Sequence, residues 1–129
     1  MKYVVGFILS NDKQNILLIR KNRPEWQKGF LNGIGGKIEK DEIPLEAIIR
    51  ECYEECGLDI QQWYPFSKTV FYADNTELNF FYSLSADISL AKTKTDEEIV
   101  IFPIRAIPIK ETLPDIVGIL SLILSYLNT

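Results

Sequence analysis

The stretch that decides the fold runs from Gly36 to Leu58 and reads GKIEKDEIPLEAIIRECYEECGL. Pro44 is favoured at the first position of a helix, where its missing N–H leaves no bond unmade. Gly57 is favoured just past the end of a helix. Between them, apolar residues recur at spacings of three and four, as Leu45, Ile48, Ile49, Cys52 and Cys56. The pattern therefore predicts a helix with one apolar face, flanked by loops.

Three glutamates occupy another face of this predicted helix. Glu51, Glu54 and Glu55 have i, i+3, i+4 spacing, so their carboxylates lie close together and repel one another unless they find partners. Oxygen ligands of this kind suit a hard divalent cation such as Mg²⁺. Taken by itself, the spacing is equally typical of a solvated acidic surface.

The whole stretch resembles the Nudix box, which reads Gly, five residues, Glu, seven residues, then Arg-Glu-aliphatic-x-Glu-Glu-x-Gly-aliphatic. The seven fixed letters of that pattern are all present, as Gly36, Glu42, Arg50, Glu51, Glu54, Glu55 and Gly57. Cys52 stands at an aliphatic position, where a small apolar side chain still packs. The resemblance implies an α/β protein with a Nudix-type α/β/α sandwich, a mixed β-sheet between helices, over a single domain 1–129 whose Nudix box spans residues 36–58.

The resemblance also implies a metal-dependent hydrolase that acts on pyrophosphate bonds. Its metal, Mg²⁺ with Mn²⁺ possible, would be held by the Gly36 carbonyl and by Glu51, Glu54 and Glu55. Arg50 would orient the carboxylates, and Glu54 and Glu55 are candidate catalytic residues. We further expect Gly36 to let the backbone turn tightly.

The general base could also come from a later loop. Glu97 and Glu98 lie at the start of a predicted strand, residues 98–104, that would pass near the site. Of this pair, Glu98 is the candidate catalytic residue. An exposed charged turn is the alternative interpretation of the same two residues.

The remainder of the chain supplies a sheet and a second helix. Residues 3–9 and 16–20 predict one β-hairpin, and residues 63–72 and 77–85 predict another. Pro114 and Asp115 begin a last helix that is apolar on nearly all sides through residue 127. We expect that helix to be buried on both faces or to pack against a partner.

The run from Asn32 to Glu39 resembles that of MutT-like nucleoside triphosphate pyrophosphohydrolases, in which this Asn contacts the base. Four residues are candidates for substrate binding: Asn32, Arg23, Lys37 and Asp115. The substrate implied is a (deoxy)nucleoside triphosphate, with an oxidised purine possible, cleaved to monophosphate and pyrophosphate. A dinucleotide or nucleotide sugar, or a non-catalytic nucleotide-sensing domain, is the alternative. Asp115 can also be read as a first-turn acid of the last helix.

The amino-acid composition excludes several kinds of catalytic site and of binding partner. The chain has no His, which excludes Ser-His-Asp or Cys-His catalysis and imidazole metal sites. The net charge of −4 argues against stable nucleic-acid binding, and residues 37–55 alone carry that whole excess of acid. Cys52 and Cys56 are expected to be buried structural residues.

The apolar run 116–127 is too short to span a bilayer, so we expect no membrane association and a cytoplasmic location. The apolar last helix leaves two expectations for the oligomeric state, a monomer or a homodimer.

Overall fold

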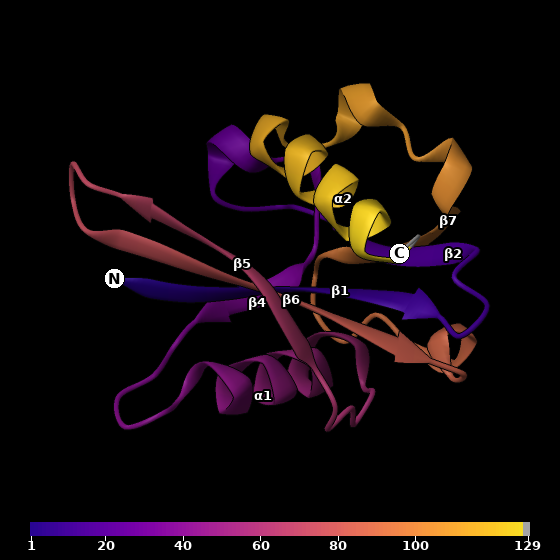
Figure 1. Ribbon diagram of the computed structural model, residues 1–129, viewed down its shortest axis with the longest axis horizontal. Helices are drawn as coiled ribbons and strands as arrows, with labels where there is room; N and C mark the ends of the chain where they lie inside the picture. Colours follow the sequence, from indigo (N-terminus) through magenta and orange to yellow (C-terminus); the bar gives the residue numbers. More distant parts are fainter. Residues whose placement is uncertain (128–129) are drawn as a thin grey trace.

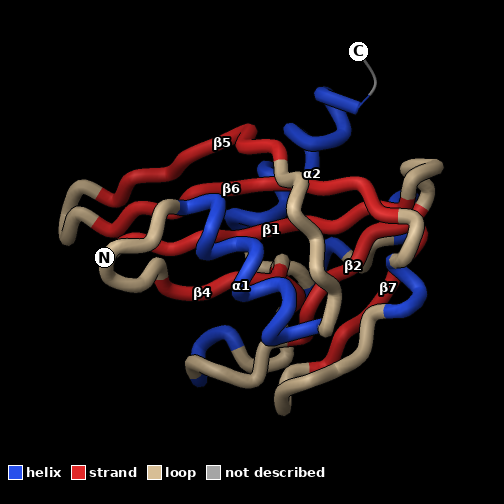
Figure 2. The backbone as a smooth tube through the Cα atoms, turned by 90° about the horizontal axis from the view of Figure 1, so that it is seen from below, coloured by secondary structure: helices blue, strands red, loops and turns tan. Residues whose placement is uncertain are grey.

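The computed structural model describes residues 1–127, so the last two positions of the predicted domain lie outside the described residues. A central β-sheet separates two helices (Figure 1). Helix α1 (Pro44–Cys56) covers one face and helix α2 (Pro114–Leu127) covers the other. The view from below places α1 in front of the sheet and α2 behind it (Figure 2). The predicted α/β/α sandwich is confirmed.

The sheet is mixed, as predicted. Its long strands are β1 (Lys2–Ser10), β2 (Asn15–Arg20), β5 (Tyr64–Phe71), β6 (Thr76–Ser85) and β7 (Glu98–Pro103). Strand β1 runs parallel to β6 and antiparallel to β2, and β7 pairs with β2 in antiparallel register. Short 3₁₀ helices at Glu25–Gln27, Ile88–Leu90, Ile104–Ala106 and Ile109–Glu111 connect the larger elements.

Two short strands were not predicted, because one has only two residues and the other contains two glycines, which disfavour sheet structure. Strands β3 (Leu31–Asn32) and β4 (Ile34–Lys37) pair with β2 and β1, respectively. A Cβ atom on Gly35 would overlap the carbonyl oxygen of Val4, so only glycine permits this close pairing. Gly36 lies inside β4 rather than in a tight turn, so that part of the prediction is wrong.

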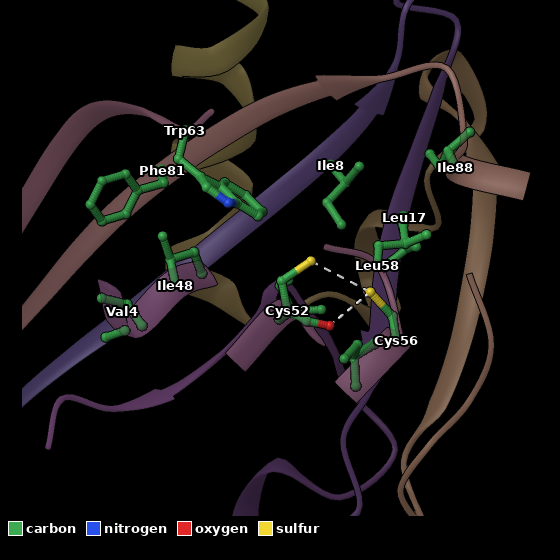
Figure 3. Close-up of a cluster of buried hydrophobic side chains, with 13 residues drawn as sticks. Val4, Ile8, Leu17, Ile48, Cys52, Cys56, Leu58, Trp63, Phe81 and Ile88 are labelled. Carbon is green, nitrogen blue, oxygen red and sulfur yellow. Dashed lines mark hydrogen bonds between the residues drawn. The ribbon is translucent and has the colours of Figure 1, made fainter. Parts of the chain in front are cut away.

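Helix α1 packs on the sheet through Ala47, Ile48, Cys52 and Cys56, all fully buried (Figure 3). The predicted apolar face is therefore confirmed except at Leu45, which remains exposed because it belongs to the first turn, at the rim of the sheet. The Sγ atoms of Cys52 and Cys56 lie 3.6 Å apart, and the Cys56 thiol donates to the Cys52 carbonyl. Both cysteines are free and buried, as expected of structural residues.

Helix α2 buries one face only, through Ile116, Leu120 and Ile123. Leu122 and Tyr126 are exposed, so the expectation that it would be buried on both faces within this chain is wrong. The sheet offers one apolar surface to the helix, and a single layer of contact leaves the far side open. Among residues 1–127, no helix is long and apolar enough to cross a membrane.

Candidate active site

Helix α1 holds its polar side chains on a rigid support. Pro44 occupies its first turn, and the Ile43 N–H donates to the Glu46 carboxylate at 2.9 Å. At the other end Gly57 adopts a left-handed conformation, with φ of 75°, and its N–H donates to the Tyr53 carbonyl. Since both ends are capped, the positions of the glutamates between them are well defined.

Arg50 is the hub of the acidic face. Its Nε and Nη2 atoms donate to the two oxygens of Glu42 at 2.7 and 2.9 Å. Its Nη1 atom donates to Glu51 at 3.0 Å and to Glu54 at 3.3 Å. This pairing, chiefly the hydrogen bond from Arg50, lowers the pKa of Glu42 to about 2. The guanidinium thus orients three carboxylates and offsets their repulsion.

Strand β4 and helix α1 meet at Gly36. A Cβ atom there would lie 2.5 Å from one carboxylate oxygen of Glu51, so the absence of a side chain makes room for that carboxylate. The Gly35 N–H donates to Glu55 at 3.4 Å. Burial, followed by the negative charge of Glu51, raises the pKa of Glu55 to about 9. Two carboxylates therefore crowd against the glycine backbone.

These groups fit a hard divalent cation. The space beside Gly36 would be filled by a Cβ atom if another residue stood there. The oxygens around this space belong to carboxylates and backbone carbonyls, which are the ligands that such ions take. Arg50 hydrogen-bonds to Glu54. Within residues 1–127, no three acidic or cysteine side chains are arranged closely enough to hold an ion. Glu54 is exposed, so its side chain has room to turn from Arg50 toward Glu51 and Glu55.

A cavity of about 620 Å³ lies next to the glycines. Its lining comprises Tyr3, Val4, Val5, Lys21, Pro24, Trp26, Gln27, Asn32, Gly33, Gly35, Gly36, Phe71, Thr76, Leu78, Leu113, Asp115 and Ile116. Volumes of this size are typical of sites for small ligands. Gly35 and Gly36 belong to the lining, and the Glu51 carboxylate packs against Gly36, so the cavity and the acidic face of α1 share this strand.

Two of the predicted substrate-binding residues line this cavity. Asn32 accepts a hydrogen bond from the Gly33 N–H on its side-chain oxygen at 2.7 Å. Its amide nitrogen therefore remains as the donor that can meet a ligand. Asp115, in the first turn of α2, adds a carboxylate acceptor. The cavity thus presents a donor and an acceptor from elements far apart in the sequence.

Three other predicted site residues stand elsewhere. Arg23 is exposed and pairs with Asp96 at 2.6 Å. Lys37 is exposed at the end of β4, where its carbonyl accepts from Arg50. Glu98 is exposed at the start of β7. None of these three residues belongs to the cavity lining as the described residues form it.

Lys21 and Glu97 form an ion pair that the sequence did not reveal. Glu97 is buried rather than part of an exposed turn, and it pairs with Lys21 at 3.1 Å. Lys21 lines the cavity, and its positive charge acts on Glu55. The antiparallel pairing of β2 with β7, which sets Arg20 opposite Glu98, brings the two together. In the sequence, the Lys21–Glu97 pair could have been found only by predicting that β2 pairs with β7.

Comparison with protein families matches residues 2–120 of the chain to the NUDIX domain. Among curated proteins, it is similar to the 8-oxo-dGTP diphosphatase of Escherichia coli, with 34% identity over 68 residues, covering 53% of this chain and 52% of that enzyme. It is also similar to the NAD-capped RNA hydrolase of Schizosaccharomyces pombe, with 42% identity over 59 residues, covering 46% of this chain and 15% of that protein. These alignments span about half of the first relative and a small part of the second.

Among solved structures, the fold is similar to that of the NUDIX domain of Shewanella oneidensis NrtR, determined in complex with ADP ribose. The TM-score is 0.82, with 13% sequence identity, over 98% of this chain and 88% of that one. At this level of identity the likeness concerns the fold. The match to the family over residues 2–120 includes the box helix, the glycines and the first turns of α2.

Proposed function

The chain belongs to the NUDIX domain family, and from this premise we propose that it hydrolyses a pyrophosphate bond of a nucleotide. The favoured substrate is a (deoxy)nucleoside triphosphate, cleaved to monophosphate and pyrophosphate. The observation that carries the proposal is the intact carboxylate set of α1, oriented by Arg50, beside a cavity of about 620 Å³.

In this proposal the Gly36 carbonyl, Glu51, Glu54 and Glu55 hold a divalent cation, Mg²⁺ or Mn²⁺. When bound, the cation neutralises phosphate charge and makes water a better nucleophile. Arg50 keeps Glu51 and Glu54 within reach of one another through its hydrogen bonds at 3.0 and 3.3 Å. The oxygen-only donor set supports a hard cation over a softer one such as Zn²⁺.

A carboxylate must also accept the proton of the attacking water. Glu54 is the best placed of the candidates, because it is exposed and is held only by Arg50 among its recorded partners within residues 1–127. Glu55 contributes from the buried side of the same turn. Glu98 is the candidate outside the box, at the exposed start of β7.

The cavity supports recognition of a purine. Asn32 offers a donor and Asp115 an acceptor, and purine edges carry an acceptor next to a donor. Trp26 and Phe71 also line the cavity and give a base aromatic surface to stack on. The similarity to an 8-oxo-dGTP diphosphatase supports an oxidised purine triphosphate as one member of the test panel. Arg23 and Lys37, both exposed, would attract phosphates from outside the cavity.

Two alternatives follow from the comparisons. A compound with a nucleoside diphosphate joined to another group is favoured by the similarity to an NAD-capped RNA hydrolase. A domain that binds a nucleotide without cleaving it is the other alternative, since the fold of the ADP-ribose complex is so similar. The complete set of box glutamates supports turnover, because a binding domain needs fewer of them.

The test is a substrate panel with the purified protein and Mg²⁺ or Mn²⁺. The panel holds ordinary and 8-oxo purine triphosphates, pyrimidine triphosphates, NAD and ADP-ribose, with products separated by ion-exchange chromatography. We expect monophosphate and pyrophosphate from a triphosphate, and no reaction in excess EDTA. Tight nucleotide binding without any turnover would instead identify a sensing domain, and faster cleavage of NAD or ADP-ribose would reassign the substrate.

A further inference from the structure

Building on the proposed hydrolysis, we propose that Glu97 is a positioning residue. It holds residues 21–28 as one wall of the nucleotide cavity, and it holds the Lys21 ammonium at that wall. The side chain acts through this loop and this cation rather than on the reacting atoms.

The contacts of Glu97 use both of its oxygens. Oε1 accepts from the Lys21 ammonium at 3.1 Å. Oε2 accepts from the backbone N–H of Asn22 at 2.7 Å and of Arg23 at 3.3 Å. The residue is 9% exposed. A buried carboxylate with each oxygen occupied by charged or backbone donors is a fixed anchor for the groups that donate to it.

The loop that Glu97 holds forms part of the cavity. Lys21, Pro24, Trp26 and Gln27 belong to the lining. The base of the loop is closed by backbone bonds, from the Lys21 N–H to the Phe30 carbonyl and from the Gly29 N–H to the Lys21 carbonyl. Its tip is largely solvent-exposed, with Trp26 at 70%. The two backbone bonds to Glu97 are therefore a main restraint on where the Pro24–Gln27 wall stands.

Asp96 reinforces the same attachment from the surface. Its carboxylate accepts from the Asn22 side chain at 2.9 Å and from Arg23 at 2.6 Å. Since both of these partners are exposed, these hydrogen bonds by themselves add little to the stability of the loop. The buried bonds of Glu97 carry most of the restraint.

The segment that carries Glu97 is also bound to α1. The Lys94 N–H donates to the Glu55 carbonyl at 3.2 Å, and the Lys92 N–H donates to the Cys56 carbonyl at 3.0 Å. Residues 92–97 thus bridge the last turn of the box helix and the loop at residues 21–28. This bridge sets the cavity wall at a fixed place relative to the carboxylates.

Lys21 adds a positive charge to the cavity wall that this bridge holds. Its ammonium, whose side chain is 20% exposed, pairs with Glu97, and its positive charge opposes the rise that burial causes in the pKa of Glu55. A cation so placed at the wall of the cavity favours a polyphosphate there. Removing the Glu97 charge would free the ammonium to swing toward Glu55 or toward solvent.

Two variants separate these contributions. In Glu97→Gln the side-chain carbonyl still accepts from the backbone of residues 22 and 23, but the charge partner of Lys21 is lost. Glu97→Ala removes both. Asp87→Asn, an exposed acid outside the site, is the matched control.

We expect KM for the nucleotide to rise about fivefold in Glu97→Gln and more than about tenfold in Glu97→Ala, while kcat stays within about threefold. The control should leave both constants unchanged. A fall in kcat of about a hundredfold in Glu97→Gln at unchanged KM would overturn the proposal, since it would place Glu97 among the groups that act on the reacting atoms.

Amide hydrogen exchange, followed by NMR, tests the attachment without any turnover. In Glu97→Ala the amides of Asn22 and Arg23 should exchange more than about tenfold faster, while those of β1 keep their rates. In Glu97→Gln they should stay protected. Unchanged exchange at both amides in Glu97→Ala overturns the proposal. If the wild-type protein cleaves no nucleotide, the proposed function fails, but the exchange result still decides the role of Glu97; if Glu97→Ala does not fold, Glu97→Gln supplies the kinetic result.

Discussion

The two sides of the site are built in different ways. On the carboxylate side, the contacts are short in sequence: Arg50 reaches Glu42 eight residues away and Glu54 four residues away. On the cavity side, Lys21 meets Glu97 across 76 residues, and Asp115 comes from the last helix. One side follows from helical spacing, and the other exists only once the sheet has formed. The difference predicts that changes on the first side alter chemistry and changes on the second alter recognition.

The strongest test of this division is Glu54→Gln. Under the proposed function, removing a carboxylate that holds the cation and accepts a proton should lower kcat by about 10²- to 10⁴-fold. The exposed position of Glu54 means that the free energy of unfolding should change by less than about 0.5 kcal/mol. Steady-state kinetics and urea unfolding measure the two effects.

The matched control is Glu46→Gln, on the same helix. Its side chain accepts only the Ile43 N–H among the contacts recorded within residues 1–127, and Gln can keep that bond. Its kcat should equal that of the wild type. A Glu54→Gln variant with near-normal turnover would remove Glu54 from the catalytic set and shift the assignment to Glu55 or Glu98.

The second prediction concerns the pH dependence of stability. Arg50 lowers the pKa of Glu42 from 4.5 to about 2 in the folded protein. The stabilisation is therefore fully present above about pH 4.5 and is lost as the pH falls toward 2. After solvent screening is allowed for, it amounts to about 2 kcal/mol.

This contribution is measured as a difference between two proteins. Between about pH 6 and pH 3 the free energy of unfolding should fall more steeply for the wild type than for Glu42→Gln, which lacks the titrating group. Parallel curves for the two proteins would show that Arg50 does not lower the pKa of Glu42 in the folded protein. In that case the carboxylate side would be less tightly ordered than its short contacts indicate.

The same division explains what could be predicted from the sequence. Helix α1, its caps and the proximity of Arg50 to Glu54 all follow from spacing. Strand β4 could not be predicted, since its Gly35 is required by the close approach of β1 rather than by local preference, and β3 is only two residues long. The burial of Glu97 could not be predicted either, because a run such as Thr95 to Glu98 is charged in sequence and becomes an anchor only beside β2.

The third prediction uses glycine to test the junction of β4 and α1. In Gly36→Ala the new Cβ atom would come within 2.5 Å of the Glu51 carboxylate, which must move. We expect the Mg²⁺ or Mn²⁺ concentration for half-maximal rate to rise about tenfold, or about 1.4 kcal/mol of metal affinity. The measurement is a metal titration of the initial rate.

Gly118→Ala provides the comparison. In the described part of the chain, nothing lies within 4 Å of a Cβ at Gly118, which sits on the exposed face of α2. This change should leave the metal requirement unaltered and stabilise the protein by about 0.5–1 kcal/mol. An unaltered metal requirement in Gly36→Ala as well would separate Glu51 from the metal and leave it as a partner of Arg50 alone.

The smallest expected effect is on the cavity side, at Asp115. In Asp115→Asn an acceptor is replaced by an amide that can also donate, so a base edge that donates at this point loses its charged partner. We expect KM for the best purine triphosphate to rise about fivefold, the preference over pyrimidines to fall, and kcat to hold. Asp115 also lies in the first turn of α2, where a carboxylate stabilises a helix by about 0.3–1 kcal/mol. Lost stability without any change in KM or preference would make Asp115 a helix-end acid, and the cavity side would then read the base through Asn32 alone.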